Sequence, residues 1–196
     1  KIKPMVFSGL YPGDSDDYDN LRQALEKLKL NDASLEFIPE TSEALGFGFR
    51  CGFLGLLHLE IIQERLEREF NLDLVTTTPN VIYNIIDKSG KIIKVDTPAK
   101  MPETGEIQEI LEPVVKAEIL TPKKYIGAIM NLCQKKRGVY INTNYLSPDK
   151  AQLHYELPLG EIIFDFYDKL KSISSGYASF DYEFKEFLNA KLQKLD

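Results

Sequence analysis

The residues with the clearest chemical meaning are basic side chains gathered in the second half of the sequence. No acidic residue occurs between Glu118 and Asp149, and five basic residues fall in that stretch. Cations grouped without intervening acids indicate a focused contact with an anion such as a phosphate backbone. The five are Lys123, Lys124, Lys135, Lys136 and Arg137.

A simpler explanation accounts for only some of these cations. The last three precede Gly138 and end an expected helix, where positive charge complements the helix dipole and a glycine stops the helix. Lys123 and Lys124 lie at the other end of that helix, where cations are disfavoured. On the residues alone, contact with RNA and a solvated helix surface therefore remain equal alternatives.

Charge elsewhere in the chain gives a nucleic-acid role little support. The formal net charge is -6 at pH 7. The first 78 residues hold 8 basic and 14 acidic residues, whereas residues 113–196 hold 12 and 10. Lys169 and Lys171 are weaker candidates for RNA contact, because aspartates lie close to both.

Other residues that could do chemistry favour structural interpretations. The sequence has no G-x-x-x-x-G-K-[ST] motif, so no loop that cradles a nucleotide phosphate is predicted. The glycines of residues 46–55 alternate with phenylalanines, which predicts a strand that another backbone approaches closely. His58 and Glu60 are two residues apart on an expected helix, so they point to different faces and cannot act together. We expect His58 and His154 to be structural, and we predict no catalytic or cofactor-binding residue.

The remaining candidate ligands do not predict a metal site. Cys51 and Cys133 both lie in apolar patterns, which indicates two buried free thiols in a reducing compartment rather than a disulfide. The two cysteines and two histidines are too scattered for zinc. The acids of residues 14–19 lack the spacing of a calcium loop. They suit a helix N-terminus instead, for which Asp14 and Ser15 are the expected caps. No apolar run approaches the roughly 20 residues of a membrane span.

These residues are positioned by a pattern of elements that occurs twice: strand, helix, strand, strand, helix, strand. Such a repeated split βαβ pattern predicts an α+β chain with two ferredoxin-like (βαββαβ) domains, each an antiparallel sheet with helices on one face. The first copy has strands at 5–11, 35–38, 44–53 and 73–77, and apolar helical stripes at 18–28 and 59–70. The second has strands at 114–120, 139–146, 151–157 and 177–184, one helix capped by Thr121 and another over 158–173.

The expected boundaries follow from these elements. Residues 1–78 form the first domain and residues 113–184 the second. Between them, residues 79–112 contain a hairpin around a turn at 87–90, followed by a linker rich in proline and glycine. Residues 185–196 are expected to be a tail that leads toward a further domain.

Several motifs, spread over both halves of the sequence, are similar to those of one known family. Residues 57–70 resemble the second helix of domain III in elongation factor G. Residues 111–116, 121–127, 135–138 and 158–161 resemble parts of its domain V. Elongation factor G has a large domain IV between these two, whereas here only the hairpin and linker separate them. Residues 9–12 and 45–55 look specifically like elongation factor 4.

The resemblance implies a longer parent with a GTPase domain, a β-barrel domain II and a domain beyond residue 196. It implies GTP and Mg²⁺ as cofactors of the parent, with none held by this part of the chain. The implied partners are the ribosome, through ribosomal RNA and proteins, tRNA-bearing ribosomal complexes, and the parent's own GTPase domain, which Arg50 is expected to contact. A monomer in the bacterial cytoplasm is implied, with peripheral association at the inner face of the cell membrane as a family-level expectation. The implied role is back-translocation or fidelity of protein synthesis under stress.

Two other functions are weighed against this one. Paired ferredoxin-like domains can form a regulatory module that binds a small ligand, and this is the alternative hypothesis. An independent hydrolase of the acylphosphatase type is disfavoured, because no loop offers the Arg and Asn that it would need. Salt-sensitive ribosome binding would favour the ribosomal role, and a thermal shift with an amino acid or nucleotide would favour the regulatory module.

Overall fold

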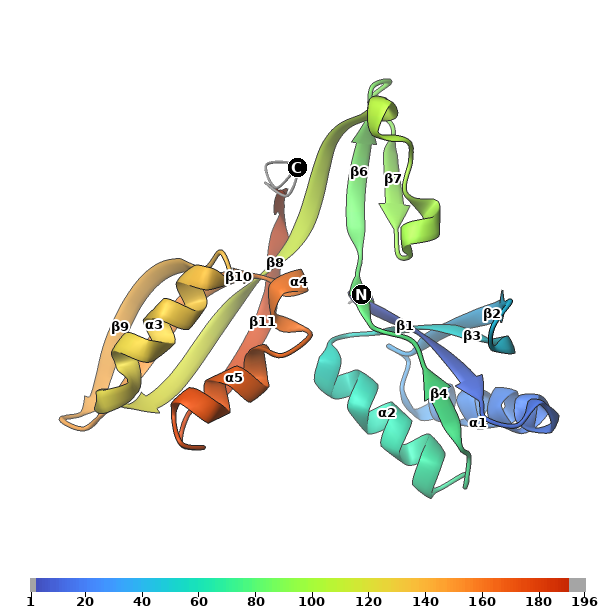
Figure 1. Cartoon of the computed structure of the whole chain (residues 1–196), viewed down its shortest axis with the longest axis horizontal. Coiled ribbons are helices and arrows are strands. Elements are labelled where there is room, and N and C mark those ends of the chain that lie inside the picture. The colour runs from blue at the N-terminus through green and yellow to red at the C-terminus, as the bar shows by residue number, and fades with distance from the viewer. Residues whose placement is uncertain (1–2, 191–196) are drawn as a thin grey trace. The chain divides into compact units, whose positions relative to one another are not determined.

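The computed structural model describes residues 3–190 and shows an α+β chain with two antiparallel sheets and helices (Figure 1). The chain divides into two compact units. The first comprises Lys1–Ile82 and Asp96–Lys100, and the second comprises Tyr83–Val95 and Met101–Asp196. The chain therefore passes between the units three times, and the hairpin expected as a connector is part of the second unit.

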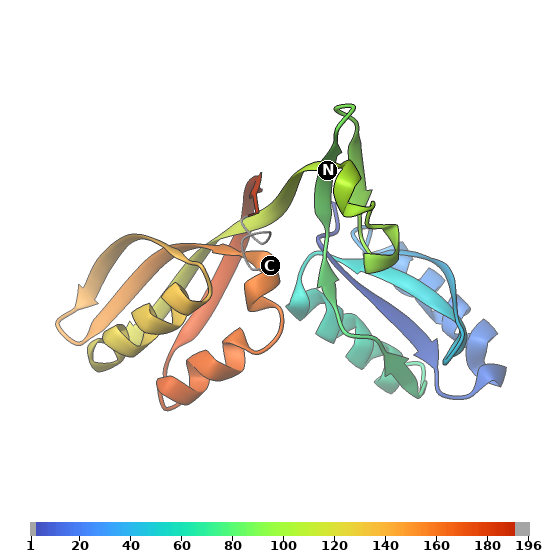
Figure 2. The same ribbon diagram turned by 45° about the horizontal axis from the view of Figure 1, so that its top comes forward.

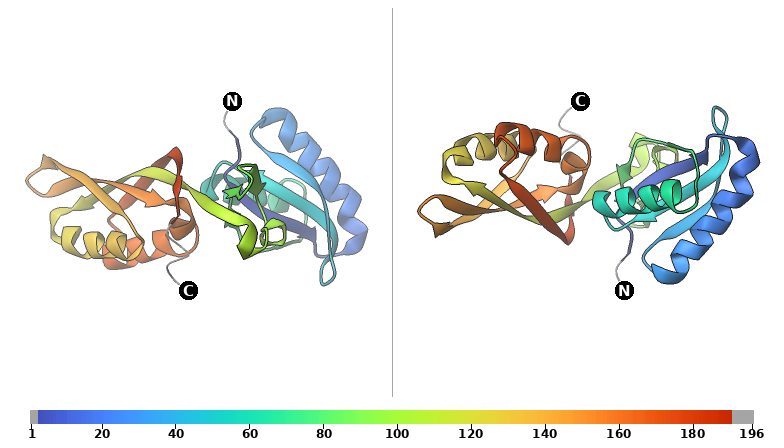
Figure 3. Two further views of the ribbon diagram at one scale, coloured as in Figure 1. Left: turned by 90° about the horizontal axis from the view of Figure 1, so that it is seen from above. Right: turned by 90° about the horizontal axis from the view of Figure 1, so that it is seen from below.

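The first unit has the predicted order of elements. Its sheet has the strand order β2-β3-β1-β4, with β5 paired to β1. Figures 2 and 3 show both helices on one face of this sheet. The elements are β1 (Val6–Pro12), the 3-10 turn η1 (Ser15–Asp17), α1 (Tyr18–Asn31), β2 (Glu36–Ser42), β3 (Gly46–Phe53), α2 (Leu56–Arg68), β4 (Leu74–Thr76), β5 (Asn80–Val81) and the 3-10 turn η2 (Pro98–Lys100).

Both helices of the first unit form because an apolar stripe recurs every three or four residues and is buried against the sheet. The start of α1 is prepared by Asp14, whose carboxylate accepts a hydrogen bond from the Asp16 amide at 2.9 Å. This confirms Asp14 as a cap, although it caps η1 rather than α1 itself. The buried stripe residues are Leu21, Leu25 and Leu28 in α1, and Leu59, Ile62 and Leu66 in α2.

The glycine-rich strand β3 shows the predicted close approach of another backbone, most clearly at Gly48. A Cβ atom there would lie 2.6 Å from the Leu10 carbonyl oxygen and would overlap the ring of Tyr11. Only glycine leaves room for β1 to pass at this point.

The second unit repeats the order, with the hairpin added to its sheet. The strand order is β7-β6-β8-β10-β9, and β11 pairs with β8 on its other side. Figure 1 shows α3 and α5 side by side on one face. The elements are β6 (Tyr83–Asp87), β7 (Ile92–Val95), the 3-10 turn η3 (Thr104–Glu106), β8 (Ile107–Pro122), the 3-10 turn η4 (Lys123–Tyr125), α3 (Ile126–Lys135), β9 (Val139–Ser147), β10 (Lys150–Pro158), α4 (Leu159–Ile162), α5 (Phe166–Ile173) and β11 (Ser179–Asn189).

Strand β8 is longer than predicted because it has two successive partners along one edge. Its first part pairs with β6, where Asn84 lies opposite Leu111, and its second part pairs with β10. The expected linker is therefore partly strand. Strand β11 also continues to Asn189, opposite Leu111, so the start of the expected tail is paired strand. Residues 191–196 of that tail lie outside the described residues.

Two local predictions in the second unit are wrong. The single helix over 158–173 is two helices, because the chain leaves helical geometry before Asp165, which precedes α5. Thr121 does not cap the following helix, because it is a buried strand residue whose hydroxyl donates to the Pro122 carbonyl at 3.1 Å. The N-cap position of α3 is Tyr125, whose side chain makes no capping hydrogen bond.

Candidate nucleic-acid interface

The exposed face of α3 is the best candidate for contact with RNA. Ala128, Asn131 and Lys135 are exposed, and their spacing of three and four residues places them on one face of the helix. Gly127 is exposed as well, and a Cβ atom there would meet no atom within 4 Å. Small side chains on this face leave room for the backbone of a partner to approach the helix closely.

Lysines stand at both ends of this face. Lys123 and Lys124 lie in η4, immediately before α3, and both are exposed. Along α3, a rise of about 1.5 Å per residue separates them from Lys135 by roughly 17 Å. The charges that are neighbours in the sequence therefore form two groups in space rather than one cluster.

The pair of lysines in η4 has no carboxylate partner within residues 3–190. The ammonium of Lys124 lies 5.2 Å from the centroid of the Tyr125 ring, a cation–π distance. The Tyr125 pKa is lowered, first by a hydrogen bond with Ser175 and then by the positive charge of Lys124. The first turn of α3 contains no acid, so these cations face the positive end of the helix dipole without compensation.

The other predicted cations are engaged within the unit. Lys136 pairs with Asp165 at 3.3 Å, and Lys169 pairs with the same carboxyl group at 3.1 Å. Hydrogen bonds from these two lysines, with that from Lys169 the stronger, lower the Asp165 pKa. Lys171 donates to the Gly176 carbonyl at 3.3 Å. Asp165 thus links the end of α3 to the start of α5.

Among the predicted cations, Arg137 makes the most hydrogen bonds to carboxylates within residues 3–190. Its two terminal nitrogens donate to the two carboxylate oxygens of Glu112, each at 2.8 Å, and its Nε donates to Glu161 at 2.9 Å. Glu112 is buried, with 3% of its surface exposed. Hydrogen bonds to Glu112 and then Glu161 raise the Arg137 pKa, so the side chain stays charged. Arg137 therefore fastens the end of α3 to β8 and α4, and its donors are not free for a phosphate.

The end of α3, where Arg137 is held by these carboxylates, also differs from the prediction. Arg137, and not the predicted Gly138, has the left-handed backbone, with φ of 59°. Gly138 is required for another reason, since a Cβ atom there would lie 2.8 Å from the Cys133 carbonyl oxygen. The prediction of a glycine stop is therefore wrong in its mechanism.

Exposed tyrosines on β9 were not among the predicted site residues. Tyr145 is 60% exposed and lies opposite Ala151, which in turn lies opposite Thr121, two residues before η4. Tyr140 is 46% exposed. Exposed aromatic rings are typical of surfaces on which unpaired RNA bases stack. Tyrosines in a strand close to a basic run were the signal that could have identified them.

Arg50, the predicted interdomain contact, is committed within the first unit. Its guanidinium donates to the side chain of Asn80 at 2.9 Å and to the Asp96 carbonyl, and it lies 3.9 Å from Glu40. These contacts hold the segment Asp96–Lys100 against β3. Glu40 also accepts from Tyr11 at 2.5 Å, and burial, followed by this bond, raises the Tyr11 pKa to about 12.

His58 has hydrogen-bonding partners on both ring nitrogens, and the two cysteines are the buried free thiols that were predicted. The backbone amide of Leu54 donates to Nδ1 of His58, and Nε2 of that ring lies 2.6 Å from Asp32. Cys51 and Cys133 are buried free thiols, and burial raises the pKa of both. Within residues 3–190, no three His, Cys, Asp or Glu side chains are grouped to hold a metal ion, and no helix could cross a membrane.

Comparison with known proteins agrees with the resemblance seen in the motifs. Residues 3–78 match the family model of elongation factor G domain III, and residues 109–196 match that of the elongation factor G C-terminus. The chain is 62% identical to elongation factor 4 of Agathobacter rectalis and 60% identical to that of Parabacteroides distasonis, in each case over 196 residues. These alignments cover the whole chain but only 32% and 33% of the relatives, so the chain spans about a third of their length.

A crystal structure of a protein from Thermus thermophilus shows the same fold. It aligns with a TM-score of 0.61 over 98% of this chain and 42% of that chain. The sequence identity is 18%, so this likeness concerns the fold alone.

Proposed function

Because this chain belongs to the elongation factor 4 family, we propose that it is a ribosome-docking, non-catalytic part of a translational GTPase, in which α3 of the second unit contacts ribosomal RNA. The observation that carries the proposal is the exposed face of α3, which carries no acid and has at both ends lysines that make no ion pair within residues 3–190. Lysines before a helix N-terminus destabilise the helix, because their charge opposes the helix dipole. Phosphates of a bound partner would compensate for this destabilisation.

The structure supports a smaller set of RNA-contacting residues than the sequence suggested. We assign direct phosphate contact to Lys123, Lys124 and Lys135, which are exposed and make no ion pair within residues 3–190. Lys136, Lys169 and Lys171 have internal partners and would contribute mainly through the field of their charge. Arg137 would act indirectly, by holding the end of α3 in place.

We assign both units to the ferredoxin-like class, each with its sheet and pair of helices as an interaction platform. The strand orders β2-β3-β1-β4 and β9-β10-β8-β11 support this, since they correspond element by element. We propose further that the hairpin over β6 and β7 belongs to the second domain. In the first domain, Arg50 would support contact with the GTPase domain by fixing the segment Asp96–Lys100.

The activity of the whole protein is part of the same proposal. The parent would hydrolyse GTP with Mg²⁺ in a separate domain and act on tRNA-bearing ribosomal complexes, in back-translocation or fidelity. This part of the chain would supply ribosomal contacts and mechanical coupling. The family membership supports this assignment.

Ribosome co-sedimentation of the full-length parent over a salt series tests the RNA contact. The variant Lys123→Gln/Lys124→Gln/Lys135→Gln should bind more weakly at every salt concentration. Each lost phosphate contact lowers the slope of log affinity against log salt by about 0.7–0.9, so three contacts should lower it by roughly 2–3. The parent must be in its GTP-bound form throughout.

The matched control removes charge elsewhere in the same unit. Lys88 and Lys91 are exposed cations at the β6–β7 turn, and the variant Lys88→Gln/Lys91→Gln should leave the slope unchanged. If the triple variant keeps the wild-type affinity and slope, the α3 surface is only a solvated helix face. If both variants lower the slope equally per charge, the contact is not specific to α3.

A further inference from the structure

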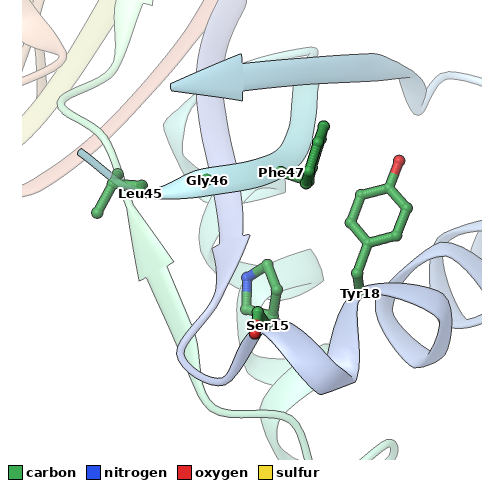
Figure 4. Close-up of a pocket in the computed structure, with 6 residues that line it drawn as sticks. Ser15, Tyr18, Leu45, Gly46 and Phe47 are labelled. Atoms are coloured by element: carbon green, nitrogen blue, oxygen red, sulfur yellow. The ribbon is translucent and has the colours of Figure 1, made fainter. Parts of the chain in front are cut away.

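The first unit contains an open pocket that the proposed RNA contact does not use. Figure 4 shows it between the start of α1 and the turn from β2 to β3. Its volume is about 460 Å³. Most of the lining is apolar. The lining residues are Pro12, Ser15, Tyr18, Leu45, Gly46 and Phe47.

One wall of this pocket is held rigidly by stacked rings. Tyr18 stacks on Phe49 at a centroid distance of 4.9 Å, and Phe49 is 1% exposed. The rings of Phe47 and Tyr18 pack in a T-shaped arrangement, with their centroids 6.2 Å apart. The ring of Tyr18 is therefore fixed from behind by the core, while Phe47 remains 68% exposed. A pre-formed apolar wall of this kind lets a partner side chain bind without ordering the pocket first.

The opposite wall is formed by the turn that precedes Phe47. Leu45 is 38% exposed, and Gly46 has φ of 80°, a left-handed conformation that favours glycine. This conformation turns the chain so that two large apolar side chains flank one glycine at the pocket mouth (Figure 4). Exposed apolar side chains gathered at a concave site are typical of a surface that a partner covers.

The charge around the pocket restricts the partner. The two segments that line it, residues 12–18 and 45–47, contain three acidic residues and no basic residue. Three exposed or half-exposed aspartates flank Ser15 at the pocket edge: Asp14, Asp16 and Asp17. A negative field of this kind repels phosphates and attracts cationic groups.

We propose that this pocket docks a basic protein segment that inserts one large apolar side chain between Tyr18 and Leu45. The apolar side chain fills the space beside Phe47, and flanking Lys or Arg residues pair with the aspartates next to Ser15. This surface lies wholly in the first unit and does not depend on the RNA contact proposed for α3.

The test uses the whole chain and a peptide probe of about 12 residues with one central Trp flanked by lysines. The chain contains no Trp, so the fluorescence of the probe reports insertion directly. We expect a blue shift of the emission and saturable binding that weakens as salt rises. Two matched peptides are compared with this probe, one with Gly in place of Trp and one with Glu in place of the lysines. The Gly peptide is measured by its competition with the Trp probe and the Glu peptide by its own fluorescence, and both should bind at least tenfold more weakly.

Two variants and one control locate the site. Phe47→Ser should weaken binding of the probe at least tenfold, and Asp16→Asn/Asp17→Asn should weaken it several-fold and reduce its salt dependence. Leu45→Ser is a second test of the pocket, and far-UV circular dichroism confirms that each variant folds. The control Ile92→Ser removes an apolar side chain of similar exposure, 64%, from the second unit and should change nothing.

Three outcomes would overturn the proposal. The first is binding that survives both Phe47→Ser and Leu45→Ser in folded protein. The second is equal binding of the peptide with glutamates, which would show an apolar site without charge selection. The third is direct, saturable binding of a single-stranded RNA to the protein that Phe47→Ser abolishes, which would assign the surface to nucleic acid.

Discussion

Replacing Arg137 by Met separates the two roles that this side chain could have. The substitution keeps an apolar stem and removes all three charged hydrogen bonds to Glu112 and Glu161. If Arg137 is a clamp, the second unit should lose stability. If it contacts RNA instead, stability should be nearly unchanged and ribosome binding should weaken.

The size of the expected loss follows from the burial of the partners. Removing one member of a buried ion pair costs about 3–5 kcal/mol, because the other charge is left buried without compensation. The side chain of Glu112 is 5% exposed, but those of Arg137 and Glu161 are each 29% exposed. Water reaches part of the site, so we expect the low end of that range, about 3 kcal/mol.

Urea unfolding of the whole chain measures this loss, and hydrogen exchange on peptides from β8 and α3 assigns it to the second unit. Adding Glu112→Gln to Arg137→Met should recover part of the stability, because the buried charge is then gone. Lys135→Met, at an exposed position near the end of α3, is the control and should cost less than about 0.5 kcal/mol. A loss below about 1 kcal/mol for Arg137→Met, with no recovery in the double variant, would refute the clamp.

Three further predictions follow from single contacts. Gly48→Ala should destabilise the first unit by about 3 kcal/mol or prevent its folding, since the new Cβ would overlap the Leu10 carbonyl. The control Gly127→Ala places its Cβ in open space and should be neutral or stabilising by up to about 1 kcal/mol. Thermal unfolding measures both variants. Limited proteolysis should cut first within residues 97–106, before β8 begins, and initial cleavage inside α2 or α3 would contradict the proposed boundaries. Burial raises the Cys133 pKa from 9.0 to about 12, so the native state holds the thiol proton more tightly than the unfolded state. The resulting contribution to stability is complete below pH 9 and is lost as pH rises toward 12. The native thiol should also resist alkylation at about pH 8 until urea exposes it.

The elements that the sequence predicted well are those specified by local pattern. Leu21, Leu25 and Leu28 of α1 recur at helical spacing and are buried as expected, and so are Leu59 and Leu66 of α2. Asp14 was identified as a cap because its role needs only the next two residues. The repeated order of strands and helices was visible for the same reason.

The features that could not be predicted depend on contacts between distant residues. Arg137 tolerates a left-handed backbone beside carboxylates that lie 24 and 25 residues away in the sequence, so no local rule would have chosen it over Gly138. The helix break before α5 occurs beside Asp165, which pairs with Lys136. The spacing of apolar residues cannot predict this pairing, because the two residues are far apart in the sequence. The length of β8 depends on the hairpin that pairs with its first half. Long-range ion pairs engage Lys136 and Arg137, and local contacts engage Lys169 and Lys171, so we propose only three of the seven predicted cations as direct RNA contacts.

The start of α3 departs most clearly from what stability alone would select, and this departure is testable. Cations at a helix N-terminus are each unfavourable by about 0.3–1 kcal/mol, and acids there are favourable by a similar amount. Lys123→Glu/Lys124→Glu should therefore stabilise the second unit by about 1–2 kcal/mol in urea unfolding while abolishing most of the salt-dependent binding of the parent to ribosomes. A gain in stability coupled to a loss of binding is the pattern of residues retained for function. If the glutamate variant is no more stable than the wild type, the lysines carry no cost, and their presence before α3 ceases to be evidence for an anionic partner.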